Sequence, residues 1–193
     1  MMKLTRVAAP LAVSLVFALG CEPEPAGPEP GSFPSSSRLA ISPDGATLYV
    51  ALPDHDEVRA IDAESGQVRA TFPVDGMPHR ITTLSDGRVA VSARQLGEVR
   101  VLDRDLTNTL GRVQVGAEPF SLMEAGEHLV VAVAGQGELA RIPLTDPTFV
   151  EDRVALLKAQ PRGLALSPDG RLYVSHFKGR GLKFEPVETF RIF

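Results

Sequence analysis

Short apolar runs, each bounded by glycine, proline or aspartate, alternate with polar turns through most of the chain. The first unit contains such stretches at residues 39–45, 47–51, 57–62 and 67–74, and each apolar run has the length of one β-strand. Comparable runs follow at regular intervals up to residue 175. The pattern predicts an all-β structure with four strands in each unit.

A repeat of about 41 residues organises residues 38–162. Three markers recur at this spacing. Asp44-Gly45 returns as Asp86-Gly87, Asp62 returns as Asp103, and Pro78 returns as Pro119 and again as Pro161. Four short antiparallel strands in every repeat of this length are typical of one β-propeller blade, and closed propellers contain four to eight blades. We therefore expect a β-propeller built of four-stranded antiparallel blades.

The number of blades limits what the chain can form. We expect blades at residues 38–79, 80–120, 121–162 and 163–193, which amounts to about three and a half to four blades. The last segment can supply two short strands, at 182–185 and 187–193, without the turn pattern of the first two blades. Three interpretations follow: a truncated or frameshifted product, a small four-bladed ring, or a half-ring that pairs with another chain.

The repeats resemble the YVTN-type β-propeller repeat family. The resemblance covers about 150 residues and rests on the stretches 41–45, 48–51, 58–62, 71–74 and 99–103. It implies the propeller fold. The family includes surface-layer proteins, periplasmic binding proteins and propeller modules attached to redox domains, so the resemblance does not define one function.

The first twenty residues are expected to be a secretory signal peptide. Lys3 and Arg6 precede an apolar run at 7–19 that is too short to span a bilayer. The segment ends in Ala-Leu-Gly before Cys21, which resembles the lipobox of bacterial lipoproteins and implies a lipidated cysteine. Residues 21–37, rich in proline, glycine and serine, are expected to form a semi-extended tether.

The lipobox resemblance also predicts a location. It implies an exported protein held to a membrane by the lipid on Cys21, and Glu22 after the cysteine favours the periplasmic face of the outer membrane or the surface of a Gram-negative bacterium. Cys21 is the only cysteine, so no disulfide can form within the chain. We expect the membrane to be one partner, through this anchor.

Charge excludes one class of partner. The chain has a formal net charge of −4 and no basic run. A surface that neutralises nucleic-acid phosphates is therefore not expected.

Candidate binding residues come from loops that blade topology should bring to one face. These loops follow the second strand of each blade or join one blade to the next. They contain Asp54, His55, Asp56, His79, Arg80, Arg94, Phe120, Arg162 and His176. Arginine suits carboxylate or phosphate, and histidine with carboxylates suits Zn²⁺ or Cu²⁺, so one interpretation is a site for an anion or a metal. The other is a solvated polar rim.

Motifs for other chemistry are missing or incomplete. Asp54-His-Asp56 lacks the glycine and glutamate that a calcium loop requires, because Arg59 and Ser65 stand at those places. The Gly-x-Gly at residues 135–137 lies between strands, with no helix to receive a pyrophosphate. No signature of a metalloprotease, hydrolase or covalent haem occurs. We expect neither a cofactor nor a metal site.

The combined prediction is a membrane-anchored, extracytoplasmic propeller that acts as a binding or scaffold module without catalysis. The candidate ligand-binding residues are His55, His79, Arg80, Arg94, Arg162 and His176. The alternative is the propeller module of a redox protein whose haem or catalytic domain is absent, in which His176 could ligate a non-covalent haem. Self-association through open blade edges is a further possibility.

Overall fold

The computed structural model describes residues 37–156, 160–167, 170–177 and 190–191. The expected signal peptide, Cys21 and nearly all of the tether lie outside these residues, as does the expected strand at 182–185. Four antiparallel sheets follow one another along the described part of the chain. Within each sheet, every strand pairs only with its neighbours in sequence.

The first three sheets have four strands each and the fourth has three. The first contains β1 (Leu39–Ile41), β2 (Thr47–Leu52), β3 (Glu57–Asp62) and β4 (Val68–Pro73), with a short 3₁₀ turn, η1 (Pro53–His55), after β2. The second contains β5 (Pro78–Thr83), β6 (Val89–Ala93), β7 (Glu98–Leu102) and β8 (Thr109–Gln114). The third contains β9 (Pro119–Ala125), β10 (His128–Val133), β11 (Glu138–Pro143) and β12 (Asp152–Ala155). The fourth contains β13 (Pro161–Leu166), β14 (Arg171–His176) and β15 (Phe190–Arg191).

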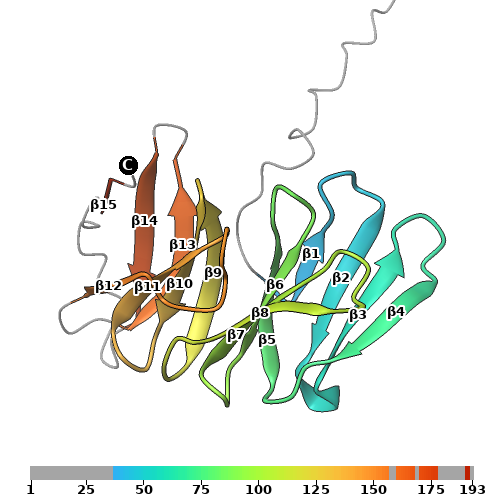
Figure 1. Cartoon of the computed structure of the whole chain (residues 1–193), viewed down its shortest axis with the longest axis horizontal. Helices are drawn as coiled ribbons and strands as arrows, with labels where there is room; N and C mark the ends of the chain where they lie inside the picture. The colour runs from blue at the N-terminus through green and yellow to red at the C-terminus, as the bar shows by residue number, and fades with distance from the viewer. Residues whose placement is uncertain (1–36, 157–159, 168–169, 178–189, 192–193) are drawn as a thin grey trace, which may run out of the picture.

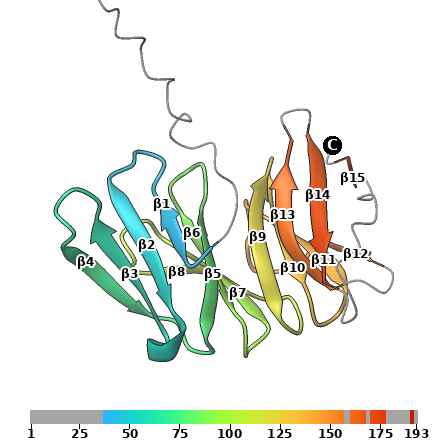
Figure 2. The same cartoon turned by 180° about the vertical axis from the view of Figure 1, so that it is seen from behind.

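The four first strands lie side by side at the centre of the molecule. Contacts join β1 to β5, β5 to β9 and β9 to β13, and the remaining strands extend outward from this row (Figures 1 and 2). No contact set of similar size joins the first sheet to the fourth among the described strands. The predicted fold is confirmed: the sheets are propeller blades, and they form an open arc of three to four blades.

The repeated prolines begin strands. β5, β9 and β13 start at Pro78, Pro119 and Pro161, two residues before the expected boundaries at 80, 121 and 163. Proline has no backbone N–H to donate, so it is tolerated at the first residue of a strand, where no ladder bond is required. These prolines therefore mark blade starts and not the connections between blades.

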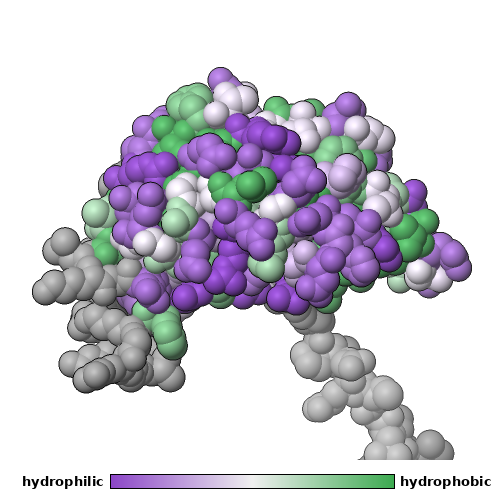
Figure 3. Space-filling view, turned by 90° about the horizontal axis from the view of Figure 1, so that it is seen from below, coloured by the Kyte–Doolittle hydropathy of each residue, from purple (hydrophilic) through white to green (hydrophobic). Residues whose placement is uncertain are grey.

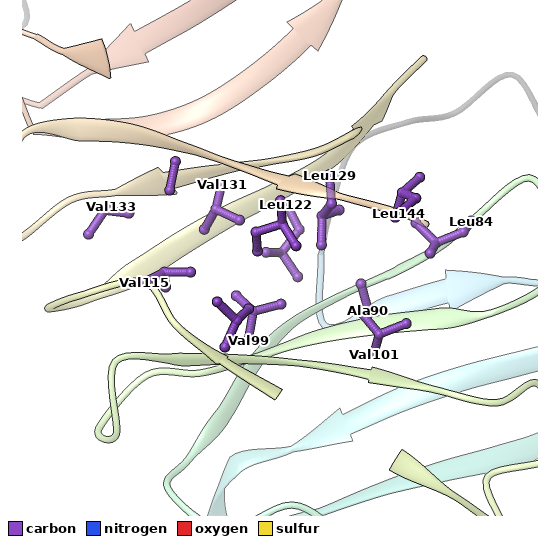
Figure 4. Close-up of a cluster of buried hydrophobic side chains, with 13 residues drawn as sticks. Leu84, Ala90, Val99, Val101, Val115, Leu122, Leu129, Val131, Val133 and Leu144 are labelled. Atoms are coloured by element: carbon purple, nitrogen blue, oxygen red, sulfur yellow. The ribbon is translucent and has the colours of Figure 1, made fainter. Parts of the chain in front are cut away.

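Apolar side chains fill the spaces between consecutive blades. Figure 4 shows the cluster between the second and third blades, where Val99 and Val101 face Leu122, Leu129 and Val131. Alternate residues of a strand point to opposite faces, so each inner strand contributes to two such clusters. The nearly continuous apolar runs of the second strands are thus explained by burial on both faces.

The turn after each first strand depends on glycine. Gly45 has a φ of 72° and its N–H donates to the Ser42 carbonyl at 2.9 Å. Gly87 has a φ of 89° and makes the same bond to Leu84. Positive φ is costly for residues with a Cβ, so the Asp-Gly repeat has a structural role.

The repeated aspartates at the ends of the third strands are also structural. The Asp62 carboxylate accepts hydrogen bonds from the backbone N–H groups of Glu64 and Ser65, at 3.0 and 2.6 Å. Asp103 accepts one from Thr107 at 2.7 Å. The Ser65 bonds, followed by Arg69, lower the pKa of Asp62 to about 2. These carboxylates fix turns and are not free for a ligand.

In the described stretches, no helix has both the length and the apolar character needed to cross a bilayer.

Candidate functional site

A β-bulge lies near the start of β5, β9 and β13, which are the first strands of the second, third and fourth blades. The pairing register shifts at His79 in β5, at Phe120 in β9 and at Arg162 in β13, each directly after the blade-initial proline. Bulges insert one extra residue into a strand and redirect its side chain. Three side chains of different chemistry are thus placed at equivalent positions on adjacent strands.

Serine hydroxyls support two of the bulges. The N–H of Arg80 donates to Ser92 Oγ at 3.1 Å, and the N–H of Gly163 donates to Ser175 Oγ at 3.0 Å. These bonds satisfy backbone donors that the bulge removes from the regular ladder. The bulges are therefore held by side chains of the neighbouring second strands.

Phe120 is the centre of the cluster. The guanidinium carbons of Arg80 and Arg162 lie 4.7 and 4.4 Å from its ring centroid. The His79 ring is tilted by 56° with its centroid 5.1 Å away, and Arg162 also lies 5.8 Å from the Phe177 ring. Cations within about 6 Å of an aromatic face are attracted to it, which holds both arginines near the ring.

Positive charge accumulates around His79. Burial, followed by the charges of Arg80, Arg94, Arg38 and Arg162, lowers the pKa of His79 to about 4. Burial and then the Arg38 charge lower the pKa of Arg80. Near neutral pH the imidazole is therefore uncharged, while all four guanidinium groups carry charge. We call Arg38, Arg80, Arg94, Arg162, His79 and Phe120 the axial cluster.

Among the described residues, one carboxylate, that of Glu118, neutralises part of this charge. Arg94 Nη2 donates to Glu118 Oε1 at 2.7 Å, and this bond is the main reason that the pKa of Glu118 is lowered. In the described part of the chain, no hydrogen bond or ion pair engages the guanidinium groups of Arg38, Arg80 and Arg162. The axial cluster thus has excess positive charge in a chain whose net charge is −4.

The axial cluster is on the side where the second and third strands are joined. The Asp56 carboxylate, next to η1, accepts a hydrogen bond from the N–H of Met77 at 2.8 Å, so the β2–β3 and β4–β5 connections meet there. Figure 3 views the molecule from this side, and hydrophilic residues cover most of the surface shown.

The expected site residues divide into two groups. His79, Arg80, Arg94, Phe120 and Arg162 come together in the axial cluster.

His55 and His176 have different surroundings. His55 is exposed on η1, and no contact described here joins it to His79. His176 ends β14 opposite Pro161, and its buried Nδ1 has no hydrogen-bond partner in the described residues. Asp54 is exposed on η1, whereas Asp56 is occupied by the loop contact to Met77.

No group of three or more histidine, cysteine, aspartate or glutamate side chains in the described ranges is arranged to hold a metal ion. The four guanidinium groups around His79 would also repel a cation. The charge of the axial cluster is therefore complementary to that of an anion.

Three residues of the site were not expected from the sequence. Arg38 precedes β1, at the position that Arg80 occupies in the second blade. Glu118 and Phe177 are contacts of Arg94 and Arg162. Arg38 could have been found by aligning the first blade with the second, whereas the other two depend on how the blades pack.

No protein-family model and no curated protein sequence matches the chain. Solved structures do match. Hydrazine synthase from Kuenenia stuttgartiensis is 20% identical, with a TM-score of 0.63, over 72% of this chain and 42% of that one. The β-propeller domain of Cps50 (Swd1) from Myceliophteria thermophila is 14% identical, with a TM-score of 0.58, over 73% and 49%. The computationally designed Ika4 protein is 16% identical, with a TM-score of 0.64, over 81% and 91%.

These likenesses concern the fold. The chain spans less than half the length of the two natural chains and most of the designed one. Together with the four consecutive antiparallel sheets, they identify the chain as a β-propeller protein.

Proposed function

We propose that this protein is an exported, lipid-anchored β-propeller of the YVTN type that serves as a non-catalytic binding module, and that the axial cluster binds an anionic group of its ligand. The lipobox resemblance at Cys21 supports the anchor, and the proline-rich tether would hold the blades away from the membrane. The anion-binding role rests on the axial cluster alone.

One observation carries the anion-binding role. Arg38, Arg80 and Arg162 come from three different blades, lie on one face and form no hydrogen bond or ion pair with an acidic side chain in the described residues, although the charge of Glu118 also acts on Arg162. Bringing like charges together raises the energy of the folded state unless a counter-charge is supplied. A carboxylate or phosphate would relieve this repulsion, and guanidinium groups bind both in a bidentate manner.

The surroundings of Phe120 favour binding of a ligand over simple exposure to water. Stacking on the ring restricts Arg80 and Arg162, so less side-chain entropy is lost when they bind. The edges of a stacked guanidinium remain free to donate hydrogen bonds. The geometry therefore resembles a preformed anion receptor.

Calorimetric titration of the full chain in detergent tests this role, with pyrophosphate and citrate as probes. The double variant Arg80→Gln/Arg162→Gln removes two stacked charges and should weaken binding at least tenfold at about 0.01 M ionic strength, where screening is small. The matched control is Arg69→Gln/Arg104→Gln, which removes the same charge from exposed ion pairs with Asp62 and Asp44.

The two variants separate a local site from a general charge effect. Equal weakening in both would show that net charge alone attracts the probes. If the unmodified chain binds neither pyrophosphate nor citrate measurably at millimolar probe concentration, the proposal is contradicted.

His79 provides a second readout at the site. The surrounding guanidinium charges contribute to its low pKa, so a bound anion should raise that pKa. Imidazole ¹H–¹³C NMR titrations with and without pyrophosphate measure this change. An unchanged His79 pKa at saturating probe would place the anion elsewhere.

The proposed anchor has its own test. Cys21→Ser should abolish labelling by a radioactive fatty acid and release the protein from the membrane fraction when expressed in a Gram-negative host. Unchanged fractionation of the variant would show that Cys21 is not the anchor.

A further inference from the structure

Among the described residues, one face of the first blade and one face of the fourth have no neighbouring blade, and these faces correspond to the two sides of the repeated interface. The argument concerns assembly and does not rest on anion binding. It begins with positions that strand register makes equivalent: Leu39, Ile81, Leu122 and Leu164, each opposite a valine of the second strand.

This equivalent position is buried in every blade that has a preceding blade. Ile81, Leu122 and Leu164 are at most 5% exposed, whereas Leu39 is 51% exposed. Leu39 belongs to a larger apolar surface, because Ile41, Leu48, Ile61 and Val68 form one row across the four strands of the first blade. Ile41 and Val68 are exposed as well. We call this surface the leading face.

In a second set of equivalent positions, the exposed residue lies in the fourth blade and not in the first. Tyr49, Ala90, Val130 and Tyr173 lie in the second strands, opposite the residues 40, 82, 123 and 165 of the first strands. The first three are at most 2% exposed, whereas Tyr173 is 42% exposed. Each of the three packs against the blade that follows it. The surface of the fourth blade around Tyr173 is the trailing face.

The leading and trailing positions meet at every internal interface. Tyr49 shares a buried cluster with Ile81, Ala90 with Leu122, and Val130 with Leu164. Leu39 and Tyr173 are therefore the unpaired members of the same repeated contact. Tyr173 repeats the residue type of Tyr49, which already packs in this way.

We propose that the trailing face of one copy of this chain packs on the leading face of a second copy, and that two copies close head to tail into one ring. Each copy carries one face of each kind, so a two-fold arrangement satisfies both contacts at once. A head-to-tail contact forms a closed ring only when its rotation closes, and otherwise forms filaments. Two copies of the four described sheets give eight blades, which is within the range of closed propellers.

A second copy is favoured as the occupant because it presents the chemistry that the internal interfaces already use. The leading face requires a tyrosine or aliphatic residue at its centre, which Tyr173 supplies. The trailing face requires the leucine or isoleucine supplied by Leu39.

Light scattering of the full chain in detergent, with the detergent mass subtracted, tests the assembly. We expect a protein mass of two chains. Leu39→Glu and Tyr173→Glu should each shift the protein to monomer, since each places a charge in both interfaces of the ring. Leu110→Glu, on the exposed outer strand β8, is the matched control and should leave the dimer intact.

Mixing the two disruptive variants distinguishes head-to-tail packing from a symmetric contact. A Leu39→Glu chain retains Tyr173, and a Tyr173→Glu chain retains Leu39, so the mixture can form one intact interface. We expect the mixture to recover dimer that neither variant forms alone. If the contact joined two leading faces or two trailing faces, one variant would dimerise alone.

Tyrosine absorbance gives an independent signal. The chain has no tryptophan and two tyrosines, Tyr49 and Tyr173, and Tyr49 is already buried. Dilution through the dimer–monomer transition should therefore change the second-derivative spectrum through Tyr173 alone, and Tyr173→Phe should remove the change.

A monomer at about 0.1 mM chain would overturn the proposal, because an interface that fails there has a Kd weaker than this value. Trimers or filaments would overturn the two-copy ring. A dimer that survives both glutamate substitutions would show that other surfaces form the contact. Thermal unfolding of each variant monitors folding, and both substitutions are at exposed positions of the single chain.

Discussion

The hydroxyl of Tyr49 donates a 2.6 Å hydrogen bond to the backbone carbonyl of Arg104, across the interface between the first and second blades. Tyr49 is buried, and burial raises its pKa. One side chain thus fills the apolar interface and satisfies a carbonyl of the β7–β8 turn. Blade packing therefore includes a directional contact as well as apolar burial.

Tyr49→Phe tests this contact. The variant keeps the ring and removes the hydrogen bond, so we expect a loss of about 0.5–1.5 kcal/mol in the free energy of unfolding, measured by urea denaturation. Tyr173→Phe is the control, measured with the chain kept monomeric by dilution, because Tyr173 occupies the equivalent position but is exposed in the single chain. Equal effects of the two substitutions would contradict a specific role for the Arg104 contact.

Buried charge at the start of β7 gives a second prediction. Arg100 Nε donates to Glu98 Oε1 at 2.6 Å, and both side chains are buried. Glu98→Ala leaves the buried guanidinium without its main partner, so we expect a loss of about 3–5 kcal/mol in unfolding free energy.

The first blade contains a matched pair for comparison. Arg59 and Glu57 have the same spacing and form the same ion pair, but they are more exposed. Glu57→Ala should therefore cost about 0–1 kcal/mol. A similar cost for the two glutamate substitutions would show that burial does not determine the strength of these pairs.

Equivalent leucines in the first strands provide a third prediction. Leu122→Ala removes a fully buried side chain between the second and third blades and should cost about 2–5 kcal/mol. Leu39→Ala, at the equivalent exposed position, should change the free energy of unfolding by less than about 0.5 kcal/mol when the chain is kept monomeric by dilution. Denaturant titration of both variants checks the difference, and a large loss at Leu39 in the monomer would contradict it.

His79 predicts a pH dependence of stability. The unfolded chain binds a proton at this residue near pH 6.5, but the folded chain only near pH 4. As pH falls from about 6.5 to about 4, protonation of His79 therefore stabilises the unfolded chain relative to the folded one. The contribution of His79 to the free energy of unfolding is fully present above about pH 6.5 and declines below it. We expect a loss of about 1–2 kcal/mol by pH 4, less than the full pKa difference would give because solvent screens this rim.

The measurement is the difference between the unmodified chain and His79→Gln across pH 4–7.5. Carboxylates titrate in both proteins, so their contribution cancels in the difference. The variant should lack the decline that begins near pH 6.5. Parallel curves for the two proteins would show that His79 takes up its proton equally well when folded.

Turn chemistry explains why the fold could be predicted from the sequence. Gly45 and Gly87 need positive φ, and Pro78, Pro119 and Pro161 can occupy only the start of a strand. These demands are local, so they are visible without knowledge of packing. The strands β5, β9 and β13 begin at these prolines, two residues before the expected blade limits.

The axial cluster could be predicted only in part. Loop position and blade topology were enough to group His79, Arg80, Phe120 and Arg162. The bulges that aim these side chains depend on pairing register, which the sequence does not show. His55 was grouped with them because it also follows a second strand, but η1 holds it in an exposed position.

The pairing of strands only with their sequence neighbours has a consequence for how the chain acquires its structure. All ladder hydrogen bonds of the first blade are complete by Pro73, and those of the second by Gln114. Few loops must close over long distances, which favours rapid local folding. A chain that emerges from a narrow pore, N-terminus first, could therefore form its blades one after another, each using the preceding blade as a template.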